Sequence, residues 1–263
     1  MKYAVSVTDT SKVQSIEKSG KLILKELERF SEQLRTISSY NSPRGIVFHD
    51  VPSATELYST IPLPAYTSRD LIHLHPVVET WKELYRPSAA GVPEAEKYYD
   101  SLTVKDVAVI AAHELTHHAD VFHSEFETWD EEDARDMWFE EGLCFYIPRM
   151  LMLSKDRCQT IMEVERLLID KYKEEYGTYP LDQFGAAGYR GGSSEALSAA
   201  FYDYWRSTHV VSVLVEKYCG GSVHSLLGIY REWVEGTSDE SLQQFFVTYF
   251  SLTKKESEAL WLL

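Results

Sequence analysis

The sequence predicts an α+β protein in which a small N-terminal β-sheet lobe precedes a mainly helical C-terminal lobe. Before Ser101, strand-like segments alternate with helical ones, whereas after Ser101 the spacing of apolar residues is almost entirely helical. The chain of 263 residues is long enough to bury a core as one large domain or as two closely packed lobes. We therefore expect an N-terminal lobe over residues 1–123 and a helical lobe over residues 124–263.

The predicted N-terminal lobe contains short strands and helices that differ in the spacing of their apolar residues. Alternating or short apolar runs predict strands at Lys2–Thr8, Ile46–His49 and Asp70–His75. Apolar residues three or four positions apart predict helices at Lys21–Ile37, Val77–Tyr85 and Glu94–Tyr99. The stretch Ser59–Arg69 contains two prolines and is expected to be a loop, and Pro87–Val92 is expected to end the second helix.

The C-terminal lobe is predicted to be helical over most of its length. Helical spacing occurs at Asp136–Leu153, Arg157–Tyr176, Glu195–Cys219, Val223–Glu235, Glu240–Phe250 and Lys254–Leu262. We expect the first of these helices to be bent or interrupted at Pro148, because proline cannot donate the backbone hydrogen bond. The acid-rich Ser124–Asp136 and the glycine-containing Thr178–Ser194 are expected to be loops, and the second carries no dinucleotide-binding or phosphate-binding pattern.

Charge and composition narrow the choice of partners and of compartment. The formal net charge of −15 at pH 7 argues against nucleic acid as a partner. No window of about twenty apolar residues predicts a transmembrane helix, and the N-terminus lacks the apolar run of a signal peptide. Three cysteines, Cys144, Cys158 and Cys219, cannot all pair and show no Cys-x-x-Cys spacing. We interpret them as free thiols, and we expect a cytoplasmic protein without a membrane partner.

The five residues from His113 to His117, with the sequence His-Glu-Leu-Thr-His, form the strongest motif in the chain. They lie in Val104–Asp120, whose apolar run predicts a buried helix with Ser101 as its N-cap. On a helix, His113 and His117 are one turn apart and their imidazoles point the same way. Two such imidazoles can bind Zn²⁺, and Glu114 beside the first can take a proton from water. The motif is the H-E-x-x-H signature of zinc metallopeptidases.

A catalytic zinc ion needs a third protein ligand, and a second motif supplies one. Residues Trp138 to Tyr146 read W-x-x-E-G-L-x-x-Y, which together with H-E-L-T-H resembles the gluzincins, the thermolysin-like and aminopeptidase-like zinc peptidases. The resemblance covers Val107–Tyr146 and implies a zincin-like fold, one Zn²⁺ ion and Glu141 as its third ligand. It also implies Glu114 as general base and a peptide or protein as substrate.

A rival third ligand stands closer to the first motif. His123 follows His117 at the spacing found in the three-histidine metzincins, but Asp120 stands where those enzymes have glycine. That glycine allows a sharp turn that aspartate tolerates less well, so Glu141 is the preferred third ligand. Metal-bound histidine usually needs a carboxylate partner, for which Asp120, Glu125 and Asp136 are candidates.

Two further features of the site follow from the resemblance. Gluzincins bind an extended substrate along an edge strand before the metal helix, and Leu71–Leu74 is the candidate for that strand. Within it and just after it, His73 and His75 alternate with apolar residues and are interpreted as one polar face of a half-buried strand. A helix in gluzincin-like peptidases directs a tyrosine toward the metal to stabilise the oxyanion. That tyrosine corresponds to Tyr204, with Tyr202 and His209 as alternatives.

These observations predict a zinc-dependent peptidase that hydrolyses peptide bonds with Glu114 as general base. The G-x-M-E-N stretch of aminopeptidases is absent, which disfavours aminopeptidase activity. Two alternatives remain open. The same scaffold could be a catalytically inactive zinc-binding module that recognises peptides or regulates a partner, or it could be a zinc amidohydrolase with a non-peptide substrate.

Overall fold

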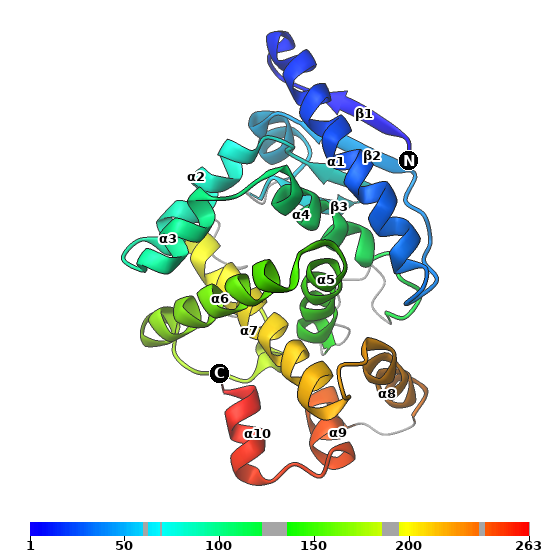
Figure 1. The fold of residues 1–263 in the computed structure, drawn as a ribbon, viewed down its shortest axis with the longest axis vertical. Coiled ribbons are helices and arrows are strands. Elements are labelled where there is room, and N and C mark those ends of the chain that lie inside the picture. Colours follow the sequence, from blue (N-terminus) through cyan, green and yellow to red (C-terminus); the bar gives the residue numbers. More distant parts are fainter. Residues whose placement is uncertain (60–62, 69, 123–135, 186–194, 237–239, 263) are drawn as a thin grey trace.

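A computed structural model describes residues 1–59, 63–68, 70–122, 136–185, 195–236 and 240–262 (Figure 1). It is a mixed α/β structure, with a four-stranded sheet near the N-terminus followed by helices. The expected boundary between lobes, at residues 123 and 124, lies outside the described residues. None of the helices in the described part of the chain is long and apolar enough to cross a membrane.

The sheet has the strand order β1-β2-β4-β3, with bounds Tyr3–Ser6 for β1, Gly45–His49 for β2, Leu71–Leu74 for β4 and Ala65–Ser68 for β3. Strands β1, β2 and β4 are parallel, and β3 pairs antiparallel to β4. The expectation that Leu71–Leu74 is an edge strand is therefore wrong, because β4 is hydrogen-bonded on both sides. The edge next to it is β3, which lies in the stretch Ser59–Arg69 that we expected to be a loop.

One face of the sheet packs against helices α1 (Val13–Leu34) and α4 (Val104–Thr116), which also contact each other. Helix α1 begins earlier than expected, and it approaches the sheet closely because Gly20 has no side chain. A Cβ atom added at Gly20 would lie 2.4 Å from the ring of Phe48. The side chains on this face, including those of Ile72 and Leu74 on β4, are completely buried. The packing of α4 against this face therefore sets the position of the helix.

The opposite face of the sheet carries a buried polar cluster. His49 Nε2 lies 2.8 Å from His73 Nδ1, and His49 Nδ1 lies 3.0 Å from the Ser53 hydroxyl. His75 Nδ1 donates to the His49 carbonyl oxygen over 2.7 Å. The short π-helix η2 (Ser53–Leu57) and the ring of Tyr58 cover this cluster. His73 and His75 are therefore fully buried rather than on a half-buried polar face.

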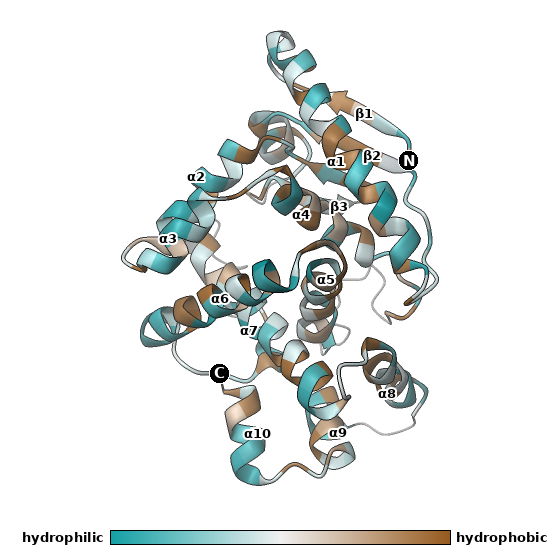
Figure 2. Ribbon diagram, viewed as in Figure 1, coloured by the Kyte–Doolittle hydropathy of each residue, from teal (hydrophilic) through white to brown (hydrophobic). Residues whose placement is uncertain are grey.

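The remaining helices are α2 (Val78–Ala89), α3 (Pro93–Asp100), α5 (Met137–Met152), α6 (Lys155–Tyr176), α7 (Glu195–Val213), α8 (Val223–Glu235), α9 (Leu242–Tyr249) and α10 (Lys254–Trp261). Short 3-10 or π segments lie at η1 (Thr10–Lys12), η4 (Leu181–Gln183) and η5 (Leu214–Tyr218). Figure 2 shows hydrophobic and hydrophilic residues sharing helices such as α6, as expected for helices with one buried side. Helix α2 passes through Pro87 and ends at Ala89, inside the stretch Pro87–Val92 that was expected to end it. Helix α5 is not interrupted at Pro148, because it continues to Met152.

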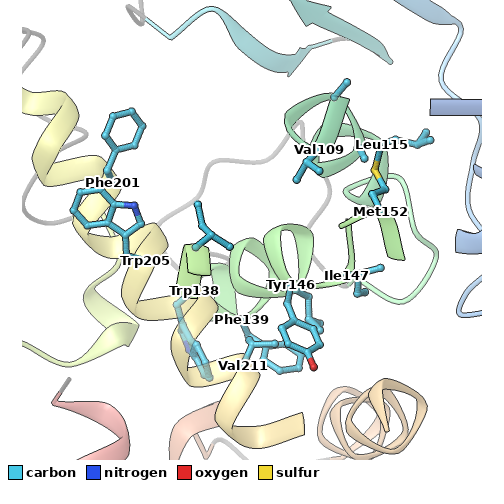
Figure 3. Packing of buried hydrophobic residues seen from close by; sticks show 14 of the residues in the cluster. Val109, Leu115, Trp138, Phe139, Tyr146, Ile147, Met152, Phe201, Trp205 and Val211 are labelled. Carbon is cyan, nitrogen blue, oxygen red and sulfur yellow. The ribbon is translucent and has the colours of Figure 1, made fainter. Parts of the chain in front are cut away.

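Helix α5 is the centre of the helical part. It packs against α4 on one side and α7 on the other, and it buries residues all around its circumference (Figure 3). Gly142 permits the approach to α7, because a Cβ atom there would lie 2.6 Å from the Ser207 carbonyl oxygen. The order α4, α5, α7 brings the two sequence motifs and Tyr204 onto neighbouring helices.

Candidate metal centre

The first motif lies at the C-terminal end of α4, whose start is fixed by its own side chains. Thr103 is the N-cap, and it forms a capping box with Asp106, whose carboxylate accepts from the Thr103 amide and hydroxyl at 2.8 and 2.7 Å. The expected N-cap, Ser101, is wrong by two residues. The helix ends at Thr116 rather than Asp120, but His117 keeps helical backbone angles, with φ −56° and ψ −23°. His117 therefore stays one turn from His113.

His113, His117 and Glu141 converge on one point. The two Nε2 atoms lie 3.1 Å apart, and Glu141 Oε2 lies 3.3 Å from His113 Nε2 and 3.4 Å from His117 Nε2. All three side chains are buried. In the described part of the chain, these residues form a group of His and Glu side chains that could hold a metal ion.

The donor spacing fits zinc. Zinc bound tetrahedrally at about 2.0–2.1 Å has ligand atoms roughly 3.3–3.4 Å apart. The three observed separations lie within about 0.3 Å of that value. Glu141 Oε2 is buried and has no hydrogen-bond partner among the described residues, which is costly for a carboxylate oxygen unless it binds a cation. Two neutral imidazoles and one carboxylate also match the donor set of catalytic zinc sites.

The electrostatics of the centre favour a positive charge at this point. Burial opposes ionisation of Glu141, but the neighbouring His117 and His113 outweigh burial and hold the pKa of Glu141 down at about 2. Burial also disfavours a charged His117, but Cys144, Glu141 and Glu140 raise the pKa of His117 well above its usual range. Both shifts mean that the three groups together stabilise a cation between them.

A second carboxylate orients the His117 imidazole through Nδ1, the ring nitrogen that faces away from the centre. His117 Nδ1 donates a hydrogen bond to Glu140 Oε1 over 2.9 Å, which turns Nε2 toward the centre as the nitrogen that could bind a metal ion. The candidates predicted for this role are not the residue found there. The Asp120 side chain is exposed, Asp136 accepts a hydrogen bond from Tyr230, and Glu125 lies outside the described residues. Helix α5 thus supplies both the ligand carboxylate and the orienting one.

Glu114 lies beside the cluster of His113, His117 and Glu141, and it contacts the edge strand β3. Its Oε2 accepts a hydrogen bond of 2.9 Å from the hydroxyl of Thr67 on β3. Burial raises the pKa of Glu114, against the opposing effect of His113, His117 and the Thr67 hydrogen bond. A raised pKa brings a carboxylate closer to the range in which it can accept and return a proton near neutral pH. Thr67 was missed in the sequence because its segment was read as a loop.

Tyr204 of α7 also reaches the site. Its ring centroid lies 6.2 Å from that of His113, and the ring of Phe145 contacts both, at 4.1 Å from His113 and 5.4 Å from Tyr204. The two alternatives lie elsewhere. The Tyr202 hydroxyl donates to the Gly177 carbonyl oxygen at 3.0 Å, and the electrostatic neighbours of His209 include Arg166 and Arg149.

A cavity of about 60 Å³ lies next to the site. Ile110, one turn before His113, borders it together with Phe145 and Tyr204. Aromatic and aliphatic side chains form most of its wall, and the buried ion pair between Arg149 and Glu165, with two contacts of 2.7 and 2.6 Å, contributes polar atoms. The cavity therefore offers a mainly apolar space bordered by Phe145, whose ring packs against that of His113.

Comparison of the chain with known proteins found no match. No protein-family model, no curated protein and no solved structure matches the chain. The rival ligand His123 lies outside the described residues. The case for a function therefore rests on the residues around the metal group.

Proposed function

We propose that the protein is a zinc-dependent peptidase of the gluzincin type, with a zincin-like arrangement of the sheet and of helices α4 and α5. The observation that carries the proposal is the convergence of His113, His117 and Glu141 beside a buried Glu114. A purely structural zinc site usually has four protein ligands, whereas three ligands with an acid beside them match catalytic sites. The resemblance of the two motifs to gluzincins points in the same direction.

The residues divide the chemistry among them. His113, His117 and Glu141 would hold Zn²⁺, which when bound lowers the pKa of water to about 7 and polarises a carbonyl group. Glu114 takes the proton of the attacking water and delivers it to the leaving amine. Tyr204 donates its hydroxyl proton as a hydrogen bond to the oxygen on which negative charge develops.

The surroundings favour an extended peptide with an aliphatic side chain in the cavity that Phe145 borders. In the described sheet, β3 is an edge strand, and an extended chain can add to such an edge by main-chain hydrogen bonds. The neighbouring cavity of about 60 Å³ is less than half of the roughly 150 Å³ that holds a benzene molecule. Side chains such as valine or leucine are therefore expected to be preferred over aromatic ones at this position.

Glu114→Gln tests the proposal. We expect the zinc-loaded wild type to cleave peptides in an unbiased library. Glu114→Gln should keep one zinc ion per chain and lose turnover by about 100-fold or more, because the amide cannot accept the proton. Glu163→Gln, the same exchange on the exposed side of α6, is the matched control and should leave turnover unchanged.

Each contrary result has a distinct meaning. Full hydrolysis by Glu114→Gln would remove Glu114 from its role. Binding of library peptides without products would favour the inactive recognition module, and the absence of stoichiometric zinc after purification with added zinc would reject the metal site itself. Cleavage of non-peptide amides alone would favour the amidohydrolase alternative.

A further inference from the structure

We infer that Thr67, on the edge strand β3, is a positioning residue that fixes the orientation of Glu114. This inference rests on the proposed function. The register of the sheet places the Thr67 side chain on the face that α4 covers, because Thr67 pairs with the buried Ile72. Its neighbour Tyr66 pairs with His73 on the opposite face. The side chain thus points at α4 by the alternation of the strand itself.

The contact distinguishes the two oxygens of the Glu114 carboxylate. The Thr67 hydroxyl donates to Oε2 at 2.9 Å, and its distance of 3.5 Å to the Glu114 carbonyl oxygen places it directly over this turn of α4. Among the described residues, Thr67 is the side chain that donates a hydrogen bond to this carboxylate, and this bond restrains the rotation of the carboxylate. With Oε2 engaged, Oε1 is the oxygen that is left to take the proton of water.

The same hydrogen bond restrains a competing arrangement. Glu114 follows His113 directly, and a carboxylate is itself a good zinc ligand. A carboxylate that rotated to bind the ion could no longer act as a base. Thr67 donates to Glu114 from the sheet, and the sheet packs against α1 and α4. This anchoring keeps the carboxylate in one orientation.

The test compares Thr67→Val, which has the same shape without the hydroxyl, with Thr67→Ser, which keeps the hydroxyl. Thr67→Val should lower kcat about 10- to 100-fold, the range for loss of a hydrogen bond to a charged group, with KM and zinc content little changed. Thr67→Ser should restore most of the turnover. In a Glu114→Gln background, Thr67→Val should have no further effect, because both changes act through the same carboxylate.

A second measurement does not depend on turnover. Crystal structures of zinc-loaded wild type and Thr67→Val should show Glu114 bonded to Thr67 in the first and rotated in the second. Unchanged kcat together with an unrotated Glu114 in Thr67→Val would overturn the inference. If the wild type cleaves no substrate but Glu114 rotates in the variant, the proposed function fails while the positioning role of Thr67 stands.

Discussion

Replacing Gly142 by alanine should destabilise the protein, although alanine is the better helix former. Gly142 lies inside α5, where this substitution alone would gain about 1 kcal/mol of helix stability. The added Cβ atom would lie 2.6 Å from the Ser207 carbonyl oxygen and 2.7 Å from a methyl carbon of Val211. Since the first of these contacts is with the backbone of α7, it cannot be relieved by rotation of a side chain.

The size of the effect follows from the required movement. Ordinary contact needs roughly 3.4 Å, so the helices must separate by about 0.8 Å at this point. Overpacking of a tight core costs up to about 3 kcal/mol. After subtraction of the gain of about 1 kcal/mol in helix stability, the net loss in the free energy of unfolding is about 2 kcal/mol. For a chain of this size, that lowers Tm by about 4–8 °C.

Urea unfolding and calorimetry of Gly142→Ala measure this loss, with Gly228→Ala as the matched control. Gly228 lies inside α8, and a Cβ atom there meets nothing within 4 Å, so the control should be more stable than wild type by up to about 1 kcal/mol. Zinc affinity then shows which helix moved. A lower affinity would indicate that α5 moved, because α5 carries the proposed ligand Glu141. An unchanged affinity would indicate that α7 moved, because α7 carries Tyr204, which is not a proposed ligand. If Gly142→Ala equals its control in stability, α5 and α7 do not pack as described.

Three further outcomes follow from the site and the sheet. Tyr204→Phe should lower kcat about 100-fold with zinc retained, and full activity would remove Tyr204 from the reaction. Glu140→Gln should weaken zinc binding about 10- to 100-fold in equilibrium dialysis, because His117 loses its orienting carboxylate; unchanged affinity would contradict that role. Burial lowers the pKa of His49 and His73 to about 4, whereas the unfolded chain binds these protons near pH 6.5. The free energy of unfolding should therefore fall as pH drops from about 6.5 to 4, and constant stability over that range in urea titrations would refute the assignment.

The two histidines of the candidate metal centre could be predicted from the sequence because their geometry is local. His113 and His117 are one helical turn apart whatever surrounds them. Glu141 is distant in sequence, and only the resemblance of the second motif to gluzincins implied it as their partner. The orienting carboxylate could not be predicted in the same way. Glu140 and Glu141 are adjacent on α5, and only the packing of α5 against α4 decides which imidazole atom each one meets.

The edge strand was missed for a related reason. Ala65–Ser68 has four half-buried residues preceded by prolines, so its local pattern indicates a loop. It becomes a strand by pairing with Leu71–Leu74, which in turn gains a neighbour on its other side and ceases to be an edge. Strand pairing depends on contacts that are not visible in the strand's own residues, and the contact of Thr67 with Glu114 was missed with it.

The two imidazoles of the centre are not equivalent before an ion arrives. The tautomer of His117 is preset by its carboxylate neighbour, whereas His113 Nδ1 is buried without a hydrogen-bond partner among the described residues. On His113, the carboxylate oxygen of Glu141 lies 3.3 Å from Nε2 and favours the proton on that nitrogen. For Nε2 to be available to a metal ion, the proton of His113 would have to occupy Nδ1, the buried nitrogen without a partner among the described residues.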